Sequence, residues 1–182
     1  MVTQKILPAL RQMQQFEKIM ESSFETFVLL DVHISQLALI RREAKRRDKK
    51  IFIHADLVHG LKTDDFAADF LLHDIRPDGI ISTRSNIILK AKKKDIIAIQ
   101  RMFLLDSMAL EKSYSLIRQT KPDYIEVLPG IIPEVITEVK ETTNIPVISG
   151  GLINTEEQVK AALRAGAHAV TTSNESLWKI NL

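Results

Sequence analysis

The chain has 182 residues, 45% of them hydrophobic, which suits a single domain over residues 1–182 with one sizeable core. It contains no cysteine, so disulfides, thiolate nucleophiles and cysteine-ligated metals are excluded. No apolar run reaches the roughly 18 residues of a membrane span, and the first residues lack the apolar stretch of a signal peptide. We therefore expect a cytoplasmic protein with no membrane partner.

Eight short apolar runs, rich in β-branched residues, recur along the chain, and helical periodicity follows most of them. The predicted strands are residues 6–9, 27–31, 51–56, 79–83, 96–101, 124–128, 146–150 and 169–172. The predicted helices include residues 12–20, 36–46, 65–72, 109–120, 133–141 and 156–165. The last helix has marked ends, because Thr155 and Gln158 form a capping-box pattern and Gly166 follows the last periodic residue.

Successive strand-then-helix units predict a small (β/α)₈ barrel of the TIM type with short loops, since a typical barrel has about 250 residues. A doubly wound open sheet is the alternative. Polar residues stand at the carboxyl end of almost every predicted strand, as expected where all strands converge on one mouth. An open sheet gathers its ligands at one switch point instead, so this distribution favours the barrel.

The strongest candidate site follows the last two predicted strands, where barrels commonly bind phosphate. Glycine lets the backbone approach an anion, neighbouring N–H groups can point at it, and the short segment 175–179 would add the positive end of a helix. The predicted phosphate-binding residues are Ser149, Gly150, Gly151, Thr172, Ser173 and Asn174. A Gly-Gly pair alone is more often a tight turn, so the prediction depends on both loops together.

Polar residues at the other strand ends either contact the hydroxyl groups of a ligand or form salt bridges at the barrel mouth. They are Asp31, His54, Asp56, Arg84, Gln100, Arg101 and Glu126. We predict no catalytic residue, because the chain has no nucleophile elbow, Walker loop or strand-following GxGxxG. We also predict no metal and no cofactor, because His33, His54 and His59 lack a ligand spacing such as HxxxH.

Two stretches carry most of the positive charge. Residues 41–50 hold seven Lys or Arg against two acids, and residues 90–95 hold four Lys against one. The two stretches carry net charges of +5 and +3. Because the net charge of the whole chain is +2, the remaining residues carry a net charge of −6. A solvated face usually explains such a run, and the alternative is a footprint for a phosphate backbone on two basic helices. The candidate contacts are Arg42, Lys45, Arg46, Lys49, Lys90, Lys92, Lys93 and Lys94.

Eight segments, in order along essentially the whole chain, resemble one protein family. They are ILPAL (6–10), LLDVHISQL (29–37), HADLVHGL (54–61), DGIISTRS (78–85), IQRMFLLDS (99–107), PDYIEVLPGIIP (122–133), SGGLI (149–153) and TTSNESLW (171–178). The family is the glycerol uptake operon antiterminators. Segments such as DGIISTRS and IEVLPG are far more specific than a generic phosphate loop.

The resemblance implies a bacterial regulator that senses glycerol 3-phosphate as its effector and binds the leader of glycerol-utilisation mRNA, so that transcription continues past a terminator. The two loops would then hold the phosphate of the effector. Asp31, Asp56 or Glu126 would accept its hydroxyls, and the basic segments would contact the RNA.

Two other classes of function compete with this one. The first is a barrel enzyme, an isomerase, epimerase or aldolase, that acts on a phosphorylated triose or sugar. Most barrels are enzymes, but the short loops leave little chain to close over a substrate. The second is a ligand-binding module with a protein partner. The sequence leaves open whether the chain forms a homo-oligomer.

Overall fold

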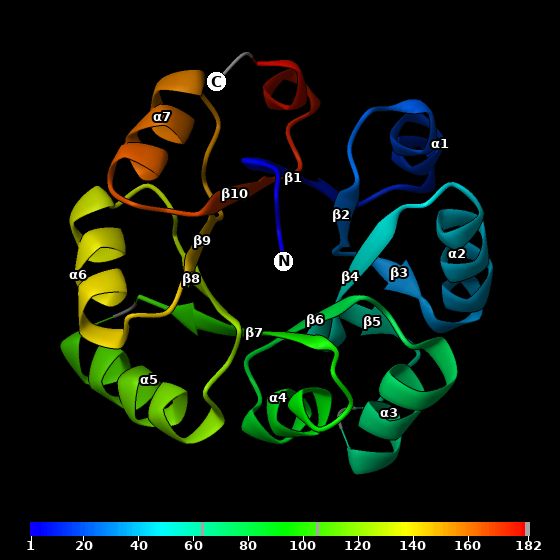
Figure 1. Cartoon of the computed structure of the whole chain (residues 1–182), viewed down its shortest axis with the longest axis horizontal. Helices are drawn as coiled ribbons and strands as arrows, with labels where there is room; N and C mark the ends of the chain where they lie inside the picture. Colours follow the sequence, from blue (N-terminus) through cyan, green and yellow to red (C-terminus); the bar gives the residue numbers. More distant parts are fainter. Residues whose placement is uncertain (63, 105, 181–182) are drawn as a thin grey trace.

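A computed structural model describes residues 1–62, 64–104 and 106–180, so Leu105 of the IQRMFLLDS segment lies outside the described residues. Its centre is a closed barrel of eight parallel strands inside a ring of helices (Figure 1). The barrel strands are β1 (Ile6–Leu10), β2 (Thr26–Leu29), β4 (Lys50–His54), β6 (Gly79–Ser82), β7 (Ile97–Phe103), β8 (Tyr124–Leu128), β9 (Val147–Gly150) and β10 (Ala169–Thr172). Strand β1 closes the barrel by pairing with β2 on one side and with β10 on the other. The predicted barrel is confirmed.

The outer ring consists of helices that follow the strands in the chain. They are α1 (Met13–Glu21), α2 (Ile34–Arg46), α3 (Asp65–Asp69), α4 (Ser85–Lys92), α5 (Ser107–Thr120), α6 (Pro133–Thr143) and α7 (Glu156–Arg164). A wider π-helical turn continues α3 over Phe70–Ile75, and short 3-10 helices cover Ala55–Leu57 and Glu175–Lys179. The capping box of Thr155 and Gln158 is formed at the start of α7, and Gly166 past its end has a φ of 100°. Both predicted ends of α7 are therefore confirmed.

A two-stranded parallel sheet, which we did not predict, lies outside the barrel. It pairs β3 (Val32–His33), which follows β2, with β5 (Val58–His59), which follows β4. His33 also caps α2, because its Nδ1 accepts a hydrogen bond from the backbone N–H of Ser35 at 3.3 Å. Two of the histidines that we considered as metal ligands therefore belong to the rim of the barrel at its carboxyl end.

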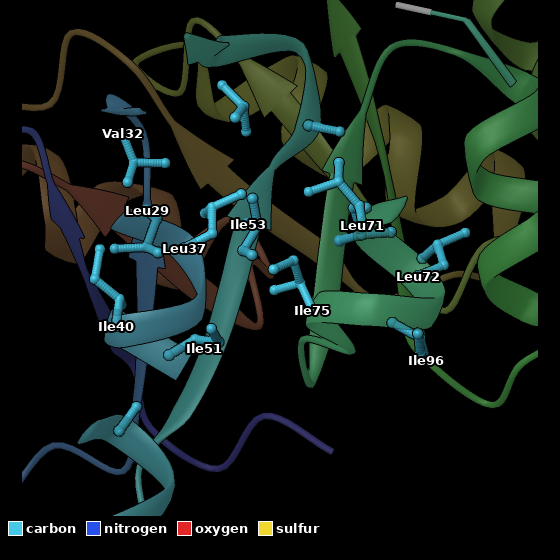
Figure 2. Packing of buried hydrophobic residues seen from close by; sticks show 14 of the residues in the cluster. Leu29, Val32, Leu37, Ile40, Ile51, Ile53, Leu71, Leu72, Ile75 and Ile96 are labelled. Atoms are coloured by element: carbon cyan, nitrogen blue, oxygen red, sulfur yellow. The ribbon is translucent and has the colours of Figure 1, made fainter. Parts of the chain in front are cut away.

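Side chains of the barrel strands alternate between the barrel interior and the layer under the helices. The interior cluster includes Leu7, Phe52, Ile99, Tyr124 and Ile148. The outward layer is visible in Figure 2, where Ile51 and Ile53 of β4 pack toward Leu37 and Ile40 of α2. Each fully buried aliphatic side chain of this kind contributes about 1.5–3 kcal/mol. The barrel is thus a packed core, and its polar residues collect at its carboxyl end.

The segment before β1 covers the amino end of the barrel, and the N label stands near the centre of the ring in Figure 1. Val2 is buried against the interior cluster. Its backbone N–H donates to the Tyr124 hydroxyl at 3.0 Å, and its carbonyl lies 2.8 Å from Nε2 of His168. The buried Val2 and its contacts therefore help to fill the barrel interior at the amino end.

Gly79 at the start of β6 leaves space that the ring of Phe52 occupies. A Cβ at this position would lie 2.5 Å from the Phe52 ring, and the ring is 1% exposed and has no room to move. We expect Gly79→Ala to lower the free energy of unfolding by about 1–3 kcal/mol, as overpacking of a core usually does. Urea denaturation measures this. Adding Phe52→Leu should recover part of the loss, and an unchanged midpoint for Gly79→Ala would contradict the argument.

The basic stretches are not wholly helical, which corrects the expectation of two basic helices. Helix α2 ends at Arg46, and Asp48 turns the chain with a φ of 52°, so Lys49 lies in a loop. Helix α4 ends at Lys92, and Lys94 stands in the turn before β7. Lys and Arg favour helices, but the pairing of β4 with β2 from Lys50 onward overrides that preference here.

Candidate functional site

A cavity of about 520 Å³ opens at the carboxyl end of the barrel. Its size is in the range of small-molecule sites. The polar residues that line it are Arg11, Arg101, Glu126, Asn154, Thr171, Thr172, Ser173 and Asn174. They come from the ends of β1, β7, β8 and β10 and from the loop after β9, and apolar side chains such as Leu30, Phe103 and Leu128 complete the wall.

Glycines shape the loop between β9 and α7. A Cβ on Gly150 would overlap the hydroxyl of Thr171 and approach Oε1 of Glu126 at 3.2 Å, so only glycine leaves room for these two side chains. Gly151 has a φ of 75°, which favours glycine, and it lines the cavity. The loop after β8 is hydrogen-bonded to this turn, because the N–H of Gly130 donates to the carbonyl of Gly150 at 2.6 Å.

The two loops after β9 and β10 carry backbone donors that the protein itself does not use. Within residues 1–62, 64–104 and 106–180, the N–H groups of Gly151, Leu152, Ile153 and Ser173 have no hydrogen-bond acceptor. The N–H of Asn174, by contrast, donates to Thr172 Oγ1 at 3.2 Å. Four donors on two adjacent loops around one cavity are the arrangement that binds an anion.

A buried ion pair forms the floor of the cavity. Arg101 Nε lies 3.2 Å from Glu126 Oε2, and their side chains are 12% and 2% exposed. Glu126 Oε1 also accepts the hydroxyl of Thr171 at 3.1 Å, while Arg101 contacts His54 Nε2 through Nη1. The Arg101 guanidinium lies 5.3 Å from the centre of the Phe103 ring. Glu126 Oε2 has no hydrogen-bond partner among the described residues, so it retains acceptor capacity.

Burial determines the protonation of this group. Burial, together with the positive charge of Arg101, lowers the pKa of His54 from 6.5 to about 4. His54 is therefore neutral at pH 7, which suits an Nε2 that faces a guanidinium. Burial raises the pKa of Glu126, and the charge of Arg101 opposes that rise. The charge of Arg101 thus offsets part of the cost of placing a carboxylate where burial disfavours the ionised form.

A second cavity of about 370 Å³ adjoins the first, because Arg11, Leu30 and Arg101 line both. It adds Asp31, which is paired with His59, and Asp56. The carboxylate of Asp56 accepts Ser82 Oγ at 2.7 Å and the N–H of Thr83 at 2.8 Å, and it lies 3.8 Å from Arg84 Nε. Asp56 therefore also ties the end of β6 to the end of β4.

Some of the predicted site residues line a mouth cavity and others do not, depending on the face of the strand on which each residue lies. Gly151, Thr172, Ser173, Asn174, Arg101 and Glu126 line the first cavity, and Asp31, Asp56 and Arg101 line the second. Ser149 lies in neither lining, and its hydroxyl donates to the carbonyl of Gly130. The Gln100 amide likewise donates to the Ser82 carbonyl at 3.1 Å, below the mouth. Gly150, His54 and Arg84 support residues that line the cavities.

Two residues of the mouth were missed from the sequence. Arg11 follows β1 directly and lines both cavities, and its guanidinium has no partner among the described residues. Thr171 points into the barrel and binds Glu126. The alternation of side chains along a strand could have indicated both residues. Leu7 and Ala9 face the barrel interior, so Arg11 continues the same face, and Ala169 likewise puts Thr171 on the interior face of β10.

The candidate nucleic-acid contacts have varied partners. Lys90 bonds Asp69 at 2.9 Å, and this bond raises the pKa of Lys90; Lys92 pairs with Asp123. Arg46 lies 3.1 Å from Glu43 and Arg42 lies 3.7 Å from the same carboxylate. Lys49 donates to the Phe24 carbonyl at 2.7 Å, and burial lowers its pKa. The side chains of Lys45, Lys93 and Lys94 have no partner in the described part of the chain.

The described residues contain no group of three or more His, Asp or Glu that could hold a metal ion. They also contain no helix that is long and apolar enough to cross a membrane.

The fold defines a class, the (β/α)₈ barrels, and here a cavity opens at the loops after the last two strands. A family model, "Glycerol-3-phosphate responsive antiterminator", matches residues 6–178. The chain belongs to this family of antiterminators, and the resemblance seen in the sequence is confirmed.

Relatives agree with this assignment. A crystal structure of the glycerol uptake operon antiterminator regulatory protein from Listeria monocytogenes is 49% identical, covers 99% of this chain and 97% of its own, and has a TM-score of 0.95. A glycerol uptake operon antiterminator-related protein from Thermotoga maritima is 32% identical, with coverages of 98% and 100% and a TM-score of 0.85. Escherichia coli YgcP is 30% identical over 96% of this chain and 92% of its own length. Aldolases at 13–16% identity share the fold alone.

Proposed function

We propose that the chain binds glycerol 3-phosphate at the barrel mouth and, with this effector bound, binds the leader of glycerol-utilisation mRNA without turning the effector over. The observation that carries the proposal is the set of four backbone donors and one cation around a single cavity. Gly151, Leu152, Ile153 and Ser173 supply the N–H groups, and Arg11 supplies the charge.

The rest of the cavity fits the other half of this ligand. Glycerol 3-phosphate carries two hydroxyls beyond its phosphate, and these need acceptors or donors. Glu126 Oε2, which faces Arg101 but has no hydrogen-bond donor, can accept one hydroxyl from the floor of the cavity. A cavity of about 520 Å³ holds so small a molecule together with water. We place the phosphate at the loops and the hydroxyls toward Glu126.

The lining argues against the rival, an enzyme of the aldolase type. Schiff-base chemistry needs a lysine that reaches the substrate carbonyl. Neither mouth cavity has a lysine in its described lining. The carboxylates are also engaged, since Glu126 is paired with Arg101 and Asp56 accepts Ser82 and Thr83. We therefore propose a regulator that acts in the bacterial cytoplasm, where it meets nascent mRNA.

The proposal predicts that glycerol 3-phosphate tightens RNA binding. A titration of the in vitro transcribed leader RNA, with and without the effector, should give a tighter Kd with it by about 5–150-fold, the usual range for coupled sites. Linkage requires RNA to tighten effector binding by the same factor, which calorimetry measures.

Two outcomes would contradict the proposal. If the Kd for leader RNA is the same with and without glycerol 3-phosphate, the sensor mechanism is wrong. Conversion of glycerol 3-phosphate or a triose phosphate, lost in Glu126→Gln, supports the enzyme instead. Glycerol, which lacks the phosphate, serves as the control ligand and should leave the RNA affinity unchanged.

A further inference from the structure

A further hollow, of about 630 Å³, lies at the opposite end of the barrel from the two mouth cavities. It is formed at the amino ends of β4, β6 and β7, beside the end of α2. Cations from three separate segments of the chain line it. They are Arg41, Lys45, Lys50, Arg76 and Lys94. The two basic stretches of the sequence, some 40 residues apart, therefore meet in one place.

Most of these cations are available to a ligand. Arg41 is not, because it donates to Asp78 at 2.7 Å and Asp78 also accepts the N–H of Ile51 at 2.9 Å, so this pair ties α2 to β4 and β6. The side chains of Lys45, Lys50, Arg76 and Lys94 are exposed and have no partner within the described residues. The acids that remain in the lining are Asp74 and Asp95.

Most other cations of the basic stretches have partners of their own among the described residues, and Lys93 is the exception. Lys90 and Lys92 are paired with carboxylates, Arg46 with Glu43, and Lys49 donates to two carbonyls. Pairing with a carboxylate reduces the gain from releasing counterions when a polyanion binds, and hydrogen bonds to two carbonyls hold the Lys49 ammonium in place. Of the four cations of these stretches that have no partner within the described residues, Lys45, Lys50 and Lys94 therefore line this hollow, and only Lys93 does not.

The arrangement suits a chain of phosphates better than a single one. Lysine is a compact charge on a flexible stem, suited to contacts with backbone phosphates that carry no sequence information. Here the lysines come from the end of α2, the start of β4 and the turn before β7, so they rim the hollow instead of converging on one point. The small phosphate ligand already has its own site at the mouth.

We propose that the leader RNA docks on the amino-end face of the barrel, with its backbone phosphates at Lys45, Lys50, Arg76 and Lys94. This inference rests on the proposed function and adds the surface that performs it. It places RNA and effector on opposite ends of the molecule, joined by β4 and β7. Lys50 begins β4, whose last residue, His54, contacts Arg101 of the mouth.

The test is the salt dependence of RNA binding by a triple variant, Lys45→Gln, Lys50→Gln and Lys94→Gln. Each lost contact with single-stranded RNA should flatten the slope of log affinity against log salt by about 0.7, so the slope should change by about 2. At about 0.1 M salt this corresponds to roughly hundredfold weaker binding. Glycerol 3-phosphate should still bind as in wild type by calorimetry, because the mouth is unchanged.

The matched control removes three cations from the exposed side of α5 and its end, Lys112→Gln, Arg118→Gln and Lys121→Gln, and should leave the slope unchanged. If the amino-end variant keeps the wild-type slope while wild-type RNA binding still responds to effector, the inference is wrong and the proposed function stands. If wild type binds no leader RNA, both are wrong. Should the triple variant lose effector binding, the single variants Lys45→Gln and Lys94→Gln decide the question, with a slope change of about 0.7 each.

Discussion

At neutral pH, Arg101→Met is expected to lower the free energy of unfolding by about 3–5 kcal/mol, the usual cost of leaving one member of a buried ion pair without the other. Glu126 is 2% exposed, and Arg101 is its counter-charge at 3.2 Å. Methionine replaces most of the arginine stem, so the loss of charge rather than of volume should dominate. Urea denaturation of the variant and of wild type measures the difference.

The loss of stability in Arg101→Met should depend on pH. Burial raises the pKa of Glu126 and Arg101 opposes the rise, so removing Arg101 raises this pKa further. A carboxyl whose folded pKa lies above its unfolded value binds more protons in the folded state, and stability is then lost as pH rises toward the folded pKa. The deficit of Arg101→Met should thus be smaller at about pH 5 than at about pH 8.

The control for this prediction is the double variant Arg101→Met, Glu126→Gln. It removes the stranded charge, so it should recover much of the stability at the higher pH. Equal deficits at both pH values, or no recovery in the double variant, would show that packing rather than charge holds this part of the barrel.

Gly151→Asp should weaken the binding of glycerol 3-phosphate by at least about a hundredfold, which is about 2.7 kcal/mol. The residue belongs to the loop after β9 and lines the mouth cavity, so an aspartate there would place a like charge beside the phosphate position that we propose. Two like charges about 4 Å apart near a protein surface repel by about 4 kcal/mol, which exceeds the predicted loss. Isothermal titration calorimetry measures the affinity.

Gly151→Asn separates charge from backbone strain. Both substitutions place a Cβ at 3.1 Å from Leu128 and both must adopt the φ of 75°. Asn has nearly the same shape as Asp and tolerates left-handed backbone, but it carries no charge. We expect Asn to retain binding within about tenfold of wild type. Equal loss in both variants would mean that the loop geometry, and not the anion site, was affected.

The sequence predicted the barrel and placed the candidate site at the carboxyl end, where the two mouth cavities lie. Strand-then-helix order is a local signal repeated eight times, and the polar residue after each strand marks its carboxyl end. What it did not predict is which of two neighbouring polar residues points inward. Thr171 and Thr172 are adjacent and identical, yet Thr171 binds Glu126 in the barrel while Thr172 contacts the carbonyl of Ile153.

That choice is set by the register of β10 against β1 and β9, which is a property of the closed sheet. The same applies to Ser149, which faces away from the mouth, and to Arg11, which faces it. The end of α2 at Arg46 was predicted, but Lys49 and Lys94 were wrongly placed on basic helices for a related reason. Lysine and arginine continue a helix by propensity, and only the tertiary position of the next strand stops it.

The length of β4 has a consequence for how effector and RNA can influence each other. Lys50 and His54 are four residues apart, which is about 13 Å along a strand. Effector and RNA are both anions, so any direct field between the two ends is repulsive, and at physiological salt it is screened beyond about 8 Å. With the two ligands placed as we propose, a direct field between them therefore cannot make their binding cooperative. We propose instead that the first ligand orders the strands that the two sites share, so that the second binds a scaffold whose conformational entropy has already been reduced.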